Sequence, residues 1–128
     1  MASVELGEVV SDRFWEIIRG ANGEAGELKR ILWAMTEAEI ALFHEEFVRT
    51  ASVLQGEPFD GLMGEDVSED GLMDIAYWVV AQGRDFYEDI LKHPEKMPQE
   101  VDENDPAIMN HVTSVVFREK FGKRLDFF

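Results

Sequence analysis

The sequence contains no cysteine among its 128 residues. A disulfide framework, a thiolate metal site and a cysteine nucleophile are therefore excluded. Serine and threonine are few, and neither a G-x-S-x-G nucleophile motif nor a glycine-rich phosphate loop is present. Only scattered histidines and abundant carboxylates are left as candidates. We therefore expect a protein that is not an enzyme and that carries no cofactor.

Long hydrophobic runs are missing as well. The longest run, IAYWVVA at residues 75–81, is far shorter than the roughly 20 apolar residues that span a bilayer. The first residues carry Glu5 and Glu8 but no Lys or Arg, whereas an export signal begins with positive charge. We therefore expect a cytoplasmic protein of bacterial type that does not bind membranes.

Basic residues are scarce: 12 Lys and Arg stand against 27 Asp and Glu, which gives a net charge of −15. Nucleic acids are bound through basic contacts, so we do not expect them as partners. Residues 57–74 contain no Lys or Arg and seven acids: Glu57, Asp60, Glu65, Asp66, Glu69, Asp70 and Asp74. This acidic surface is a candidate docking site for a basic protein, because complementary charge speeds encounter and sets specificity. The alternative is that the charge serves solubility alone.

The residues that are present favour helices. Hydrophobic residues make up 45% of the chain, with nine Phe and three Trp, which is enough for a domain with a core. Helical spacing of these residues predicts helices over residues 11–21, 24–35, 37–55, 68–82, 84–93 and 105–121. Loops are expected at 57–68 and 94–105, and no run alternates as a strand does. The expected fold is all-α, a single compact bundle of five or six helices, in one helical domain over residues 1–128.

Local signals mark where several of these helices begin and end. Thr36 and Glu39 form a predicted capping box, in which each side chain satisfies a backbone N–H of the first turn. Asp105 as cap, Pro106 at the first helical position and Gly122 just past the end predict the last helix. Four basic residues at its end are expected to complement the negative end of the helix dipole: Arg118, Lys120, Lys123 and Arg124.

The stretch DVSEDGLMDIAY, residues 66–77, begins like a calcium-binding loop. Asp66, Ser68 and Asp70 occupy its first, third and fifth positions, but Tyr77 stands where the twelfth position requires a bidentate carboxylate. The competing interpretation is that Ser68 caps a helix that has acids in its first turn. We expect the helix cap and no metal site.

His44 lies beside the apolar stripe of the helix predicted over 37–55. The zinc pattern H-E-x-x-H is incomplete, because Val48 stands where the second histidine belongs. We therefore expect a hydrogen-bonded histidine in the core or at its boundary, rather than a ligand or a proton shuttle.

The segment SEDGLMDIAYWVVAQGRDFYE, residues 68–88, carries a distinctive set, which we call the family motif: Ser68, Asp70, Gly71, Trp78, Gln82, Gly83 and Arg84. The family motif resembles the central motif of a bacterial family known as domain of unknown function 4240. FWEII at 14–18, MTEAEIALFHEEF at 35–47 and VVFREKFGKRL at 115–125 are similar to other parts of that family. Residues 55–67 and Ala76 depart from the family pattern. The resemblance implies a helical bacterial domain with no established activity.

Two functions stay open at the level of the sequence. The first is a non-catalytic acidic protein-interaction domain, such as an inhibitor or immunity-type protein that neutralises a basic partner. The alternative is a small-ligand-binding or sensor domain with a pocket near Trp78, Gln82 and Arg84. That alternative requires a cavity with convergent polar groups. Arg84 is also expected to pair with an acid, because its planar fork suits a carboxylate.

Overall fold

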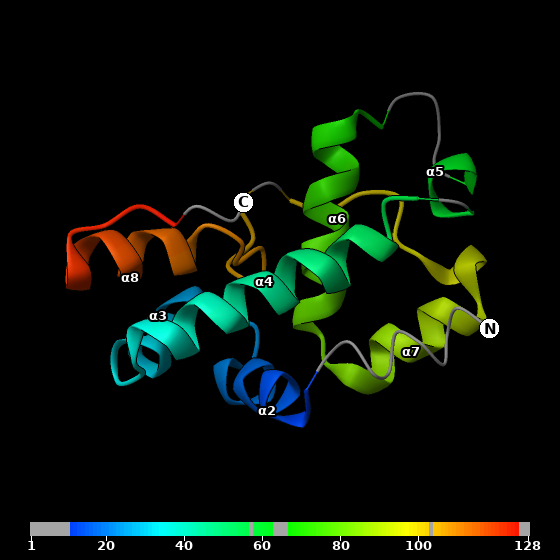
Figure 1. Ribbon diagram of the computed structural model, residues 1–128. Helices are drawn as coiled ribbons and strands as arrows, with labels where there is room; N and C mark the ends of the chain where they lie inside the picture. Colours follow the sequence, from blue (N-terminus) through cyan, green and yellow to red (C-terminus); the bar gives the residue numbers. More distant parts are fainter. Residues whose placement is uncertain (1–10, 57, 63–66, 103, 126–128) are drawn as a thin grey trace.

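The computed structural model describes residues 11–56, 58–62, 67–102 and 104–125 (Figure 1). Within these ranges there is no strand, and six α-helices have nine residues or more: α2 (Asp12–Ala21), α3 (Ala25–Trp33), α4 (Glu37–Val53), α6 (Glu69–Ala81), α7 (Arg84–Lys92) and α8 (Val112–Phe121). A four-residue helix, α5 (Phe59–Leu62), and a 3₁₀ turn, η1 (Pro94–Lys96), lie between them. The predicted all-α fold is therefore confirmed. The single domain over residues 1–128 stays a prediction.

Helix α4 runs through the middle of the structure (Figure 1). It contacts α2, α6 and α8, while α3 packs against α2 and α8, and α7 packs against α6. None of the helices within the described ranges is long and apolar enough to cross a membrane. The arrangement buries one face of α4 against three neighbours, so this helix organises the core.

The core is built on the apolar stripe of α4. Ile40, Phe47, Ala51 and Leu54 have no exposed surface, and Phe43 is only 2% exposed. The ring of Phe47 lies 5.9 Å from that of Phe14 on α2 and 4.9 Å from that of Tyr77 on α6, measured between centroids. Fully burying one large apolar side chain is worth about 1.5–3 kcal/mol, so this stripe accounts for much of the packing between α2, α4 and α6.

The predicted helix starts are confirmed at three caps. The hydroxyl of Ser11 accepts the N–H of Phe14 at 3.2 Å, and that of Ser68 accepts the N–H of Gly71 at 3.0 Å. Thr36 and Glu39 form the capping box in both directions. Each cap satisfies backbone donors that the first turn of a helix leaves without partners.

The predicted start of the last helix is wrong. Helix α8 begins at Val112, and residues 105–111 form turns. Asp105 accepts the N–H of Ala107 through Oδ1 at 2.9 Å, and the indole N–H of Trp78 through Oδ2 at 3.3 Å. Side chains of Asp that bond to nearby backbone compete with helix formation. Burial of Ile108 and Met109 then holds the segment in this non-helical path.

The loop predicted over residues 57–68 is also partly wrong, because Phe59–Leu62 form the short helix α5. Phe59 is 3% exposed, and α5 lies against η1. Burial of this aromatic ring offsets the poor helix propensity of a Gly-containing turn.

Candidate functional site

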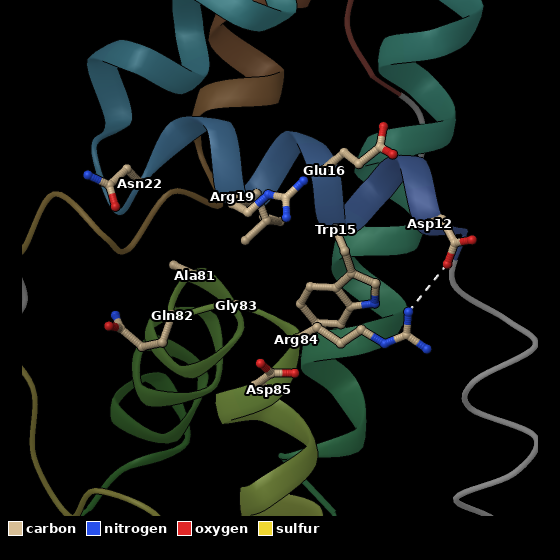
Figure 2. A pocket seen from close by; sticks show the side chains of 11 residues that line it. Asp12, Trp15, Glu16, Arg19, Asn22, Ala81, Gln82, Gly83, Arg84 and Asp85 are labelled. Carbon is tan, nitrogen blue, oxygen red and sulfur yellow. Dashed lines mark hydrogen bonds and ion pairs between the residues drawn. The ribbon is translucent and has the colours of Figure 1, made fainter.

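A cleft of about 510 Å³ opens between α2 and the junction of α6 with α7 (Figure 2). The residues on its walls come from two stretches that are some 60 positions apart in the sequence, 12–22 and 81–85. Six of these residues define its shape and chemistry: Trp15, Arg19, Asn22, Gln82, Gly83 and Arg84. We call this opening the first cleft.

The junction between α6 and α7 depends on a glycine. Gly83 has φ 107° and ψ 172°, a backbone conformation that residues with a Cβ rarely adopt. No heavy atom lies within 4 Å of the position that a Cβ would take, so the backbone angle, and not crowding, requires glycine. Gln82 ends α6, and its side-chain amide donates to the carbonyl oxygen of Trp78 at 3.1 Å. The sharp turn therefore places Arg84 at the start of α7, facing α2.

Arg84 pairs with two acids, as expected from the sequence, and the pair with Asp12 joins α7 to α2. Its Nη1 lies 3.3 Å from Oδ1 of Asp12, and its Nε lies 3.1 Å from Oε2 of Glu88. The hydrogen bond to Glu88 and the charges of both acids raise the pKa of Arg84, so the guanidinium stays charged. Arg84 therefore provides a fixed positive charge at the cleft.

The opposite wall belongs to α2. Trp15 is half-buried, with its ring centroid 5.0 Å from that of Phe14 and 5.5 Å from that of Tyr87. Arg19 is exposed and makes no ion pair or side-chain hydrogen bond with another described residue. Asn22 ends the helix in the left-handed region, with φ 50°. An indole, a second guanidinium and an amide thus face the α6–α7 junction across the cleft (Figure 2).

The first cleft contains charges of both signs. Its walls also include three carboxylates, from Asp12, Glu16 and Asp85. Arginine forks bind carboxylates and phosphates, and carboxylates accept from amines and hydroxyls. The cleft is therefore equipped to hold a small polar molecule that has both donors and acceptors.

The structure divides the family motif between the two ends of α6. Gln82, Gly83 and Arg84 line the first cleft. The remaining motif residues do not: Ser68, Asp70 and Gly71 lie at the start of the helix, and Trp78 packs against Phe86 with 6.0 Å between ring centroids. A helix of 13 residues is about 20 Å long, so one small ligand cannot contact both ends.

Comparison with known proteins decides the family. A family described as "Protein of unknown function (DUF4240)" matches residues 10–122. The chain belongs to this family. No curated protein and no solved structure matches the chain.

The acidic surface of this DUF4240 domain is only partly described. Glu69 and Asp70 are exposed in the first turn of α6, and neither forms an ion pair with another described residue. Asp74 is half-buried. The side chains of the remaining four predicted residues lie outside the described part: Glu57, Asp60, Glu65 and Asp66. A docking role for this surface stays a prediction.

The predicted helix cap at Ser68 is confirmed, while Asp66, the first position of the calcium-like loop, lies outside the described residues. In the part of the chain that is described, no three His, Asp or Glu side chains gather closely enough to hold a metal ion. His44 is a core histidine, as predicted. It is 5% exposed, and its Nδ1 lies within hydrogen-bond distance of the hydroxyl of Thr113 on α8.

Sequence reasoning missed one charged residue in the core of the DUF4240 domain. Glu46 is 6% exposed, and it accepts the backbone N–H of Ser11 at 2.6 Å and the Ser11 hydroxyl at 3.1 Å. A carboxylate on α4 thereby completes the cap of α2. One signal was available, because Glu46 follows Phe43 by three positions and so lies on the apolar stripe of its helix.

Proposed function

We propose that this protein is a non-catalytic small-ligand-binding domain, with its binding site in the first cleft. One observation carries the proposal: three consecutive residues of the family motif line that cleft together with Arg19 and Asn22 from a distant part of the sequence. Convergence of polar side chains from separate elements is typical of ligand sites. We further propose a location in the bacterial cytoplasm, which the absence of cysteine supports.

The mixed charge of the first cleft defines the class of ligand. Arg19 is the side chain that is best placed to meet an anionic group, because no described acid engages it. Arg84 is bonded to Asp12 and Glu88. Its contribution to ligand binding is therefore mainly a positive charge at a fixed position, rather than a free hydrogen-bond donor. The carboxylates of Glu16 and Asp85 provide acceptors. A small zwitterionic or polyhydroxylated molecule fits this set.

The test is a thermal-shift screen of small polar metabolites against the purified protein. A ligand that binds only the native state must raise the melting temperature. Arg19→Ala should abolish the shift without lowering the stability of the free protein, since Arg19 makes no described side-chain bond. Arg30→Ala is the matched control, because Arg30 is an exposed arginine that pairs with Glu27 on α3, away from the cleft.

The outcomes are distinct. A hit that is lost in Arg19→Ala and retained in Arg30→Ala supports the proposal. A screen without hits, or hits that both variants retain, would show that the first cleft binds no such molecule.

A second candidate is an acidic protein-interaction domain that neutralises a basic partner, as an inhibitor or immunity-type protein does. The supporting observation is the net charge of −15 together with exposed Glu69 and Asp70, neither of which is paired with a described cation. Contacts between exposed charges weaken as salt shortens the screening length. Complementary charge would also give fast association with the partner.

This second candidate is tested by a pull-down from cell lysate at low salt and at several-fold higher salt. One dominant basic protein, released by salt and bound less by a Glu69→Gln, Asp70→Asn double variant, supports it. The matched control neutralises two exposed acids elsewhere, Glu24→Gln and Glu100→Gln, and should leave capture unchanged. If no basic protein is captured in a salt-sensitive way, this second candidate function is refuted.

A further inference from the structure

A second cleft, of about 580 Å³, opens between α4, α6 and α8. Helix α4 packs against both α6 and α8 (Figure 1). None of the described residues lines both this second cleft and the first cleft. Its walls include Tyr77 from α6, Ser114 and Arg118 from α8, and Arg124 beyond the end of α8.

The charge of the second cleft is opposite to that of the molecule. The chain has 27 acidic and 12 basic residues, yet the described residues that line this cleft include two arginines and no carboxylate. Neither Arg118 nor Arg124 makes an ion pair with another described residue. Guanidinium groups gathered in a concave site attract anions.

The neighbouring lysines show that this arrangement is not a general property of the C-terminal basic residues. Lys120 donates to the backbone carbonyl of Met35 at 2.9 Å, and Lys123 pairs with Glu37 at 2.7 Å. These two lysines hold the end of α8 against the α3–α4 connection. All four basic residues were expected to complement the helix dipole. Arg118 and Lys120 do lie in the last turn of α8, and Arg118 and Arg124 also line this cleft.

Tyr77 supplies the second, independent observation. The residue is 6% exposed and lines the second cleft, and its hydroxyl makes no hydrogen bond with any described residue. The hydroxyl oxygen keeps exposed surface, so it can donate to a molecule in the cleft. Tyr87 is the internal comparison, because its hydroxyl donates to the carbonyl oxygen of Thr50 at 3.0 Å. Burial raises the pKa of Tyr77, so its hydroxyl remains a donor at neutral pH.

We propose that the second cleft binds a small organic oxyanion, a carboxylate or a phosphate, through Arg118, Arg124 and the hydroxyl of Tyr77. Hydrogen bonds from guanidinium to carboxylate or phosphate are charge-assisted and commonly bidentate. The hydroxyl of Ser114 lies on the same wall and adds a donor. Val48, Met73 and Leu125 line the rest of the cleft and provide apolar contact for the body of the ligand.

The experiment is an NMR titration of the ¹⁵N-labelled full chain, with sodium hexanoate in one arm and inorganic phosphate in the other. Sodium chloride at equal ionic strength separates binding from screening. We expect saturable shifts of the Tyr77, Ser114 and Arg118 signals. Tighter binding of hexanoate identifies a carboxylate on an apolar body, and tighter binding of phosphate identifies the phosphate ion or its small esters.

Tyr77→Phe is the decisive variant. It keeps the ring that packs against Phe47 and removes only the hydroxyl, so the melting temperature should hardly change. Binding should weaken about tenfold or more, the loss expected for one hydrogen bond to a charged group. Arg118→Gln should weaken binding as well, whereas Arg30→Gln, on α3, should not.

Absence of saturable shifts in both arms, or binding that Tyr77→Phe and Arg118→Gln leave unchanged, would overturn this inference. Arg19→Ala separates it from the proposed function, because Arg19 lines only the first cleft. Failure of oxyanion binding would therefore leave the first cleft untouched, and failure of the metabolite screen there would leave the second cleft untouched.

Discussion

At the scale of single residues, the interaction of Glu46 with Ser11 shows how the fold accommodates a buried charge. Its two carboxylate oxygens are bonded to the backbone N–H and the hydroxyl of the residue that caps α2. The carboxylate also lies at the N-terminus of that helix, where the helix dipole favours negative charge. A buried charge with these partners avoids the large penalty that an isolated one carries.

Replacing this carboxylate should therefore be costly. We expect Glu46→Ala to lower the free energy of unfolding by about 1.5–3 kcal/mol, the range for hydrogen bonds to a charged group. Urea unfolding measures this change. Glu45→Ala is the matched control, because Glu45 pairs with Arg49 on a more exposed face and surface changes usually stay within about 0.5 kcal/mol.

A double-variant cycle tests the assignment. If the loss comes from the bonds to Ser11, Ser11→Ala should cost much less in the Glu46→Ala background than alone. Simple additivity of the two variants would show that Glu46 acts through some other contact.

At the scale of helices, the residues at the helix ends determine where each helix begins and how it is oriented relative to the next. The α6–α7 turn depends on the positive φ of Gly83, and the start of α4 depends on the capping box of Thr36 and Glu39. Both signals are local in the sequence. The capping box was predicted, and so was a break between the helices at residue 83. Asp105 also resembled a cap, but its bonds to Ala107 and Trp78 hold a turn instead. Local signals therefore predict helix ends well where no distant side chain competes.

Two glycines on helices or at their ends should respond oppositely to the same substitution. Gly83→Ala forces a Cβ into a conformation that costs about 1–3 kcal/mol, so it should lower stability by that order. Gly26→Ala lies within α3 with no atom near the new Cβ, and should raise stability by about 0.5–1 kcal/mol. Denaturant unfolding of both variants checks the pair. Equal effects would refute the role of the backbone angle at Gly83.

The capping box should make stability depend on pH in a defined direction. Hydrogen bonds from the backbone and the hydroxyl of Thr36 lower the pKa of Glu39 from its ordinary value of 4.5. A carboxyl whose pKa is lowered by folding stabilises the native state above its unfolded pKa, and that contribution is lost as pH falls through the lower folded value. Stability of the wild type should therefore decline more below pH 4.5 than that of Glu39→Gln. Parallel curves would contradict this account.

At the scale of the whole molecule, charge opposes compactness. Acidic residues outnumber basic ones, 27 against 12, so even complete pairing of every cation would leave a large uncompensated negative charge. Such self-repulsion destabilises the folded state and is screened by salt. Exposed ion pairs, such as Arg13 with Glu39, weaken in salt but contribute little each.

We therefore expect sodium chloride to raise the melting temperature, with most of the rise at low ionic strength, where the screening length changes most. Differential scanning calorimetry over a salt series measures it. A melting temperature that falls with added chloride would mean that specific ion pairs outweigh the net repulsion.

The sequence by itself determined the six long helices, apart from the start of α8, together with three helix caps and the apolar stripe of α4. These follow from periodicity and from bonds between residues three or four positions apart, which each segment makes on its own. Thr36 with Glu39 and the stripe from Ile40 to Leu54 are the clearest cases.

Only the tertiary structure decided which distant residues meet. It brought Ser11 to Glu46 and Trp78 to Asp105, each separated by more than 25 positions. It also placed Arg19 across from Arg84 and Tyr77 beside Arg118, which created the two clefts. The physical reason is that such contacts depend on how whole helices pack, and packing is set by the combined burial of many side chains. No local pattern around any of these residues contains that information.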